Sequence, residues 1–333
     1  MMDITIPYYE DTSRISNSNI GQFIKYGPAY LRRMLDGEEK GLTGSFLETG
    51  TMIHMYLLQP EEFWEHYTLK EIGTPTSAQQ KAFANFIVHS DEVEPNKIVL
   101  SAYKRAYSTN GQSDDKILAN GLEMASKLKS YIDYIKDPNK KTLVSGYQFN
   151  MLQSIKANIE EHKLASKLLC KQTDAEEHNE FQINWEFPKA FNGIKLPCKS
   201  LLDRLILNIE KKEVILIDLK TSSHLYEFNE SMKNFDYLRQ LSYYWFAILW
   251  YLKNERNIDI NTIDDTWNIQ VYIVGIDTLT YQVRVFKFTD DQLQSRVPLI
   301  SSTIERICWH IDTNLWEQHK EYYEGNGEEI LEL

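Results

Sequence analysis

Asp203, Asp218 and Lys220 carry side chains whose types and spacing could support chemistry. Carboxylate oxygens bind hard divalent cations, and an ammonium group beside them can hold or activate a water molecule. Asp218 and Lys220 stand two residues apart in the apolar run VILIDLK, so in a strand their side chains lie on one face. A carboxylate buried in such a run costs several kcal/mol unless a cation compensates it. The pattern therefore predicts a cation site, with a structural ion pair at a strand end as the alternative.

The register of a predicted hairpin decides whether the two aspartates meet. If the chain turns at Glu210 and Lys211, Asp203 lies opposite Asp218, with Cβ atoms about 4.5–5.5 Å apart. That separation allows both carboxylates to share one divalent cation. A turn shifted by one residue toward the C-terminus would stagger the pair by a diagonal step.

Two further segments carry polar groups within apolar helical patterns. Gln240 and Tyr244 stand four residues apart and share one face of a helix predicted over 235–253. His54 lies among apolar neighbours in a second predicted helix. A single histidine in that setting is more often a hydrogen-bonded core residue than a ligand, and aromatic residues at helical spacing are more often core. Periodicity alone leaves the roles of these residues open.

Four motifs, in this order and spacing, resemble the PD-(D/E)xK nuclease superfamily, and within it the phage and prophage exodeoxyribonuclease VIII (RecE-like) and RecB-type exonucleases. The motifs are ISNSNIGQF…YGPAYL, ETGTMIHMYLLQPEEF, LLDRL…LIDLKTSS and YLRQLSYY. Together they cover most of the chain. The resemblance implies a restriction-endonuclease-like α/β core, in which helices flank a mixed central sheet, with a helical N-terminal elaboration.

The resemblance also implies roles for the matching residues. Asp203, Asp218 and the backbone carbonyl of Leu219 would bind Mg²⁺ or Mn²⁺, and His54 would be an additional ligand. Lys220 would position or activate the attacking water. Many members of the family carry glutamate where this chain has Asp218, and the shorter side chain changes the reach to the metal.

A second group of matching residues would contact the substrate. Gln240 and Tyr244 would line the catalytic site and contact the DNA backbone, and Ser18 and Thr221 would contact DNA or a terminal phosphate. Glu180 would be the extra acid that many members place before the first strand. Two neighbouring residues compete with it for that role, Glu176 and Glu177.

The function implied by the resemblance is a metal-dependent DNA exonuclease that works from linear ends in phage or mobile-element recombination. Its expected partners are DNA, a single-strand annealing protein and further copies of the same chain. Its expected location is the cytoplasm of a bacterial host. The alternative from another class is a catalytically inactive protein of the same fold that binds DNA or a protein partner.

The elements that must position these residues follow from hydrophobic periodicity. Periodicity predicts a mostly helical N-terminal part, 1–148, and a part with strands and a C-terminal helix, 149–333, which together form one integrated domain. The resemblance implies that the first part contributes His54 and that the second is the nuclease core. The stretch from about Ser77 to Leu169 is predicted to be helical with breaks near Pro95, Gly111 and Pro138, and the role of its part from about Ser77 to Gly146 stays open. Strands are predicted at 181–187, 195–209, 213–220, 267–276 and 279–288, and a C-terminal helix that Pro298 kinks or restarts.

Composition narrows the class of protein. The chain has 333 residues, a formal net charge of −12, and three scattered cysteines that cannot form a disulfide framework or a four-cysteine cluster, which favours a reducing compartment. It has no G-x-S-x-G elbow, no phosphate-binding G-x-x-x-x-G-K-[ST] loop and no convincing zinc-ligand pattern, and no membrane span is predicted. Because the whole chain is acidic, we expect it to coat DNA only weakly and to contact phosphate through basic residues in one confined groove. The basic residues in the catalytic segment are Lys195, Lys199, Arg204, Lys211, Lys212, Lys220, Lys233 and Arg239.

Overall fold

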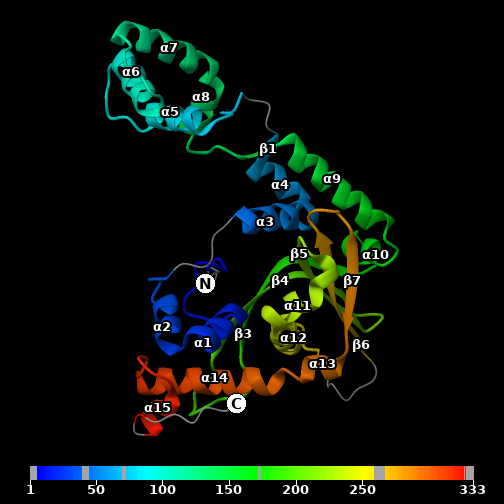
Figure 1. The fold of residues 1–333 in the computed structure, drawn as a ribbon. Helices are drawn as coiled ribbons and strands as arrows, with labels where there is room; N and C mark the ends of the chain where they lie inside the picture. The colour runs from blue at the N-terminus through cyan, green and yellow to red at the C-terminus, as the bar shows by residue number, and fades with distance from the viewer. Residues whose placement is uncertain are drawn as a thin grey trace. The chain divides into compact units, whose positions relative to one another are not determined.

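The computed structural model describes residues 6–39, 45–69, 73–171, 174–258, 267–325 and 327. The chain forms two compact units (Figure 1). One unit, here called the site unit, combines Met1–Pro60 with Met151–Leu333, and the other, the helical unit, spans Glu61–Asn150. The division predicted from the sequence, 1–148 and 149–333, stays a prediction.

The helical unit is built from short amphipathic helices, as the periodicity predicts. Its elements are α4 (Pro60–His66), β1 (Tyr67–Leu69), α5 (Ala78–Val88), α6 (Pro95–Ala106), α7 (Asp114–Lys127), α8 (Lys129–Lys136), β2 (Thr142–Val144) and the start of α9 (Gly146–Glu161). Phe83 and Ala102 lie in its core, and a Cβ on Gly121 would lie only 2.7 Å from Val99, so glycine allows α7 to pack closely on α6. The parallel pair β1–β2 is too short for a periodic signal and is absent from the predicted elements.

The site unit is organised around a mixed five-stranded sheet (Figure 1). The strands lie in the order β3 (Glu176–Glu186), β4 (Pro197–Asn208), β5 (Glu213–Ser222), β6 (Asn268–Asp277) and β7 (Val283–Phe288). All neighbours are antiparallel except β5 and β6, which are parallel because a helical crossover joins them. The mixed α/β class and all five predicted strands are confirmed.

The β4–β5 hairpin has the register predicted for a turn at Glu210 and Lys211. Asn208 pairs with Glu213, and the ladder continues to the pair formed by Arg204 and Ile217. Asp203 and Asp218 follow one step beyond this last pair. The two aspartates therefore lie side by side where the strands separate.

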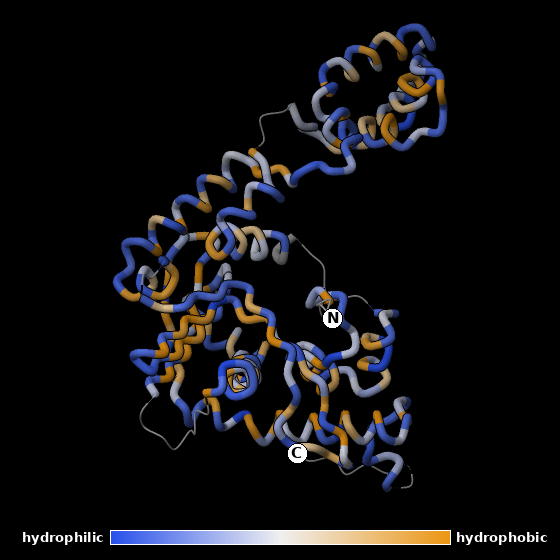
Figure 2. Tube along the Cα trace, turned by 180° about the vertical axis from the view of Figure 1, so that it is seen from behind, coloured by the Kyte–Doolittle hydropathy of each residue, from blue (hydrophilic) through white to orange (hydrophobic). Residues whose placement is uncertain are grey.

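The helices of the site unit enclose the sheet and complete its core. They are α1 (Asn17–Tyr26), α2 (Pro28–Leu35), α3 (Ser45–Leu58), most of α9, α10 (Ala165–Leu169), η1 (Leu225–Glu227), α11 (Phe228–Asn234), α12 (Tyr237–Asn254), α13 (Asp290–Gln294), α14 (Val297–Thr313) and α15 (Lys320–Glu324). α12 packs on β3, where the rings of Tyr243 and Trp185 lie 4.9 Å apart. Hydrophobic stretches gather in the sheet (Figure 2), and Val214 to Ile217 and Leu219 of β5 are buried on both faces. Asp218 is thus a buried carboxylate in a strand whose neighbouring side chains are apolar.

The C-terminal helical pattern is interrupted as predicted. α13 ends at Gln294, and Pro298 stands in the first turn of α14, where its missing N–H costs no helical hydrogen bond. Cys170, Cys198 and Cys308 are all free. Within the described ranges, no helix is long and apolar enough to cross a bilayer.

Candidate metal and catalytic site

The separating ends of β4 and β5 bring Asp203, Asp218 and Lys220 together. The backbone N–H of Leu219 donates a 2.6 Å hydrogen bond to Asp203 Oδ2, which fixes this carboxylate against β5. Lys220 Nζ lies 2.7 Å from Asp218 Oδ2, as the alternation of side chains along a strand predicts. Asp218 Oδ1 is buried and has no hydrogen-bond partner among the described residues. This buried oxygen of Asp218 therefore lacks the hydrogen bond that a buried polar atom normally has.

α3 carries His54 to the same place. His54 Nδ1 lies 3.8 Å from Asp203 Oδ2, and the imidazole also hydrogen-bonds the backbone carbonyl of Leu219. Gly50 lies one turn earlier on the same helix face, and a Cβ there would lie 3.2 Å from Thr221 Oγ1. The glycine thus allows the close approach of α3 to β5 that brings His54 to the carboxylates.

Glu180 enters the site from β3 through an irregular backbone. It lies opposite Asp203, between the ladder pairs on either side, and has a φ of 47°. The left-handed region costs a non-glycine residue on the order of 1–2 kcal/mol, and such strain concentrates at functional positions. Ligand atoms of His54, Glu180 and Asp203 all lie within 4.8 Å of one another. The structure therefore selects Glu180, and not Glu176 or Glu177, as the acid beside Asp203.

Burial shifts the pKa of both aspartates upward. Desolvation is the largest cause in each case, and it raises the pKa of Asp218 to about 6 in spite of the attraction of Lys220. Burial by itself would lower the pKa of Lys220, but the charges of Asp218 and Asp203 raise it overall. The site thus concentrates negative charge that a bound cation would stabilise.

His54 is available as a neutral ligand at physiological pH. Desolvation and then the charge of Lys220 lower its pKa to about 4, so the imidazole is uncharged at pH 7. A neutral imidazole with carboxylate and carbonyl oxygens suits a divalent cation such as Mn²⁺ or Mg²⁺. The residues present therefore fit a divalent cation. Asp218, which was also predicted to be a ligand, is not one of the three clustered residues and is paired with Lys220.

The helix α12 places its polar face toward the carboxylates. Gln240 Nε2 donates a 2.9 Å hydrogen bond to the hydroxyl of Tyr244, which confirms that the two side chains share a face. Burial and then the charges of Tyr8, Asp218 and Asp203 raise the pKa of Tyr244 well above its usual value. Gln240 and Tyr244 thus lie close to the site, although their predicted contact with DNA stays a prediction.

Ser18 is the predicted site residue with the weakest structural link to the carboxylates. It lies exposed in the first turn of α1, and its neighbour Ser16 provides the N-cap by accepting a hydrogen bond from the N–H of Asn19. Thr221 directly follows Lys220 on β5 and faces Gly50. The phosphate-binding roles of Ser18 and Thr221 stay predictions.

The N-terminal segment, residues 6–11, lies beside the site, and the sequence did not predict this position. Lys199 Nζ donates a 2.6 Å hydrogen bond to the carbonyl of Tyr8 and a second one to the carbonyl of Asp11. Partial desolvation and then the negative charges of Glu180 and Asp203 raise the pKa of Tyr9. The only signal in the sequence is the tandem aromatic pair itself, because no local periodicity connects it to residues nearly 200 positions away.

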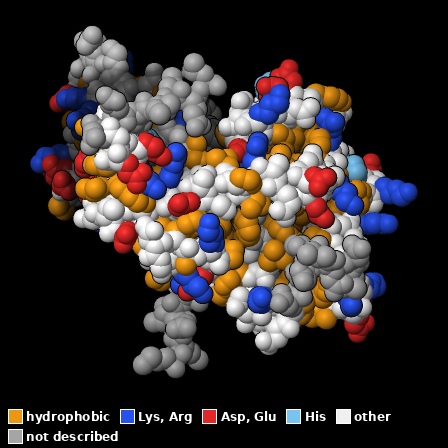
Figure 3. All heavy atoms as spheres, turned by 90° about the horizontal axis from the view of Figure 1, so that it is seen from below, with side chains coloured by type: hydrophobic (Ala, Val, Ile, Leu, Met, Phe, Trp, Pro, Cys, Tyr) orange, Lys and Arg blue, Asp and Glu red, His pale blue; other side chains and the backbone are white. Residues whose placement is uncertain are grey.

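Two of the basic residues predicted to meet phosphate are engaged inside the fold. Lys199 holds the N-terminal segment, and Arg204 is buried in contacts with Glu177 and the carbonyl of Leu168. Lys211 forms an exposed ion pair with Asp174, and its contact with phosphate stays a prediction. The face shown in Figure 3 carries acidic and basic side chains interspersed.

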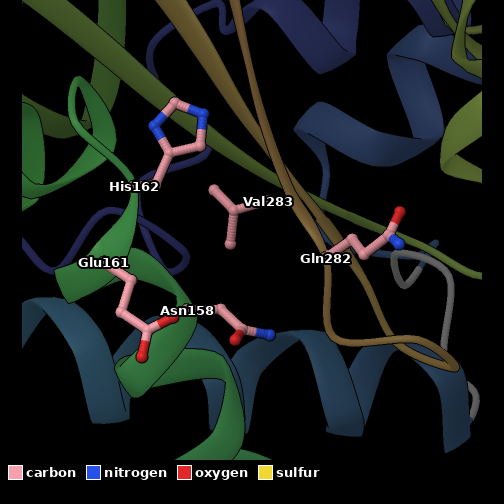
Figure 4. A pocket seen from close by; sticks show the side chains of 5 residues that line it. All are labelled: Asn158, Glu161, His162, Gln282 and Val283. Carbon is pink, nitrogen blue, oxygen red and sulfur yellow. The ribbon is translucent and has the colours of Figure 1, made fainter.

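A separate cavity of about 310 Å³ lies between the end of α9 and the start of β7 (Figure 4). Its lining consists of Asn158, Glu161, His162, Gln282 and Val283. None of these is a predicted site residue, and Asn158 is engaged with the carbonyl of Tyr281. The cavity is thus distinct from the carboxylate site.

The fold and the site define a mixed α/β protein with a candidate divalent-cation centre at the strand ends. No family model and no curated protein sequence matches the chain. Among solved structures, the chain is similar to a crystal structure of a candidate exonuclease from Eubacterium rectale, with 12% identity, a TM-score of 0.48, and coverage of 100% of this chain and 96% of the other. A second crystal structure, that of SSO0001, has 12% identity and a TM-score of 0.26, with coverage of 78% and 85%. Both TM-scores are too low to support an inference about function.

Proposed function

We propose that this protein is a metal-dependent DNA exonuclease with a PD-(D/E)xK core. The observation that carries the proposal is the convergence of His54, Glu180 and Asp203 beside the buried pair Asp218–Lys220. Phosphodiester hydrolysis needs positive charge at the scissile phosphate and an activated water, and a bound Mg²⁺ or Mn²⁺ supplies both. A glycosidase pair of carboxylates would not call for the lysine.

Each residue has a defined task in this proposal. His54, Glu180, Asp203 and the carbonyl of Leu219 hold the ion, together with Asp218. The ammonium of Lys220 orients the water that attacks the phosphorus. Asp218 keeps that ammonium in place through its 2.7 Å contact. Gln240 and Tyr244 line the approach to the site.

The wider biological setting is also part of the proposal. The protein would digest linear DNA from its ends in the cytoplasm of a bacterial host during phage or mobile-element recombination. A single-strand annealing protein would use the product, and several copies of the chain would assemble around DNA.

The test combines metal binding with DNA hydrolysis. Calorimetric titration with Mn²⁺ and digestion of end-labelled linear duplex DNA should both fail for Asp203→Asn. Lys220→Met should still bind Mn²⁺ but lose activity by about 100- to 1,000-fold, since removal of one positioned hydrogen-bond donor at the reacting atoms costs that range. Asp115→Asn, an exposed change in the helical unit, is the matched control. Intact DNA with Mg²⁺ and Mn²⁺ over several end types would refute the enzyme and favour the non-catalytic alternative.

A further inference from the structure

Two exposed aromatic rings flank the carboxylate site from distant parts of the chain. Tyr9 is 85% exposed and Phe235 is 63% exposed. An exposed aromatic ring beside a charged site offers an open apolar face to a ligand that binds there. Tyr9 lies near Glu180 and Asp203, and Phe235 stacks on Tyr237, whose ring lies beside Lys220.

Tyr9 is presented by an anchored segment. Lys199 bonds the carbonyls of Tyr8 and Asp11, and Gln182 Nε2 donates a 3.2 Å hydrogen bond to the carbonyl of Ile6. The ring of Tyr8 lies 4.7 Å from Lys199 Nζ and meets the ring of Tyr9 edge-on at 5.2 Å. These contacts hold the backbone of Tyr9 while its ring faces solvent.

Phe235 is presented by an equally constrained turn between α11 and α12. Its ring stacks on Tyr237 with centroids 5.6 Å apart and an interplanar angle of 18°, and Lys220 Nζ lies 5.1 Å from the centroid of Tyr237. The intervening Asp236 has a φ of 45°, caps α12 and accepts a 2.9 Å hydrogen bond from Arg296. Phe235 is thus the exposed member of an aromatic stack whose other ring, Tyr237, lies beside Lys220.

We propose that Tyr9 and Phe235 are stacking platforms for unpaired nucleobases, so that the DNA end enters the site as a single strand. This rests on the proposed function and names the form of its substrate. Every base has a π-face, and stacking on an aromatic side chain contributes to binding irrespective of sequence. Bases inside a duplex are already stacked on one another and cannot offer both faces. The phosphates between two stacked bases would then meet Lys220 and the cation site, which is the charge complementarity that a polynucleotide requires.

Binding of labelled oligonucleotides tests the platforms. The full chain is titrated, in Ca²⁺, into a fluorescein-labelled thymidine oligonucleotide and into a duplex of equal length, and anisotropy gives the Kd. We expect Tyr9→Ala and Phe235→Ala each to raise the Kd of the single strand about 5- to 100-fold, with little change for the duplex. Tyr9→Phe and Phe235→Tyr should restore binding. Tyr147→Ala, an aromatic residue 69% exposed in the helical unit, is the matched control.

An abasic oligonucleotide separates stacking from a structural role. Wild-type protein should bind it as weakly as the alanine variants bind the intact strand, whereas those variants should no longer distinguish the two strands. Unchanged binding by both alanine variants, or undiminished discrimination against abasic sites, would overturn the platforms. If the platforms fail in this way but the protein still digests DNA in a metal-dependent reaction, the nuclease proposal remains valid. Platform-dependent binding without digestion under any metal supports the platforms and refutes the nuclease.

Discussion

Replacing Asp218 by asparagine measures what the buried carboxylate costs the fold. Asp218 is 0% exposed, and its pKa is raised from 3.8 to about 6, chiefly by burial. One pKa unit corresponds to about 1.4 kcal/mol, so at pH 7 ionisation of this group favours the unfolded chain by about 3 kcal/mol. Asparagine has nearly the same shape and no charge. We therefore expect the metal-free Asp218→Asn protein to be about 3 kcal/mol more stable than wild type at pH 7.

The expected gain has a defined pH dependence. Because the pKa of Asp218 is higher in the folded protein than in the unfolded chain, the folded protein binds more protons between the two values. The stability of wild type therefore falls, relative to the variant, as the pH rises from about 4 to about 6. Above pH 6 the full difference is present, and below pH 4 the two proteins should be equally stable.

Urea unfolding in chelator, followed by tryptophan fluorescence, is the assay. Six of the seven tryptophans lie in the site unit, namely Trp185, Trp245, Trp250, Trp267, Trp309 and Trp316, so the signal reports mainly that unit. The equivalent rise in Tm is roughly 6–12 °C for a unit of this size. Asp312→Asn changes an exposed aspartate in the same unit and is the control. Equal or lower stability of Asp218→Asn at pH 7, or a gain that persists at pH 4, would refute the reasoning.

Three further outcomes follow from the packing and protonation of the site unit. Mn²⁺ at 100 times its Kd should stabilise wild type by about 2.7 kcal/mol and leave Asp203→Asn unchanged in thermal melts. Gly50→Ala should weaken Mn²⁺ binding by about tenfold in calorimetry, because the new Cβ presses on Thr221, 3.2 Å away, and shifts His54; an unchanged Kd would contradict this. Burial lowers the pKa of His310, so its contribution to stability is complete above about pH 6.5 and is lost as the pH falls through that value. The stability of wild type relative to His310→Asn should therefore decrease between pH 7 and pH 5 in urea titrations.

The β4–β5 hairpin could be predicted except for its register because its information is local. The apolar runs mark the two strands, and the charged residues between them mark a turn with two possible positions, of which the structure has the one at Glu210 and Lys211. The positions of Asp203, Asp218 and Lys220 follow from that register and the alternation of side chains. His54 could be connected to this group only through the family resemblance, since the 148 residues between His54 and Asp203 carry no periodic signal that relates them.

Other features depend on long-range contacts that no local pattern encodes. The left-handed backbone of Glu180 arises where β3 meets the separating end of β4, and this conformation decides among three neighbouring glutamates. Lys199 looks like a phosphate-binding cation in the sequence, yet it bonds the N-terminal segment and thereby holds Tyr9 beside the site. Charge type is visible in a sequence, but the partner of a charge is set by the folded chain.

The sequence by itself therefore determined the five strands, the β4–β5 hairpin and the residue types that could form a cation site, because these depend on residues a few positions apart. Only the tertiary structure decided which side chains complete the site and how far the pKa values of its residues are shifted. Burial of Asp218, the approach of α3 through Gly50 and the exposed rings of Tyr9 and Phe235 all result from packing between distant segments. Desolvation is a property of the whole fold, and it turns an ordinary aspartate into a group with a pKa of about 6.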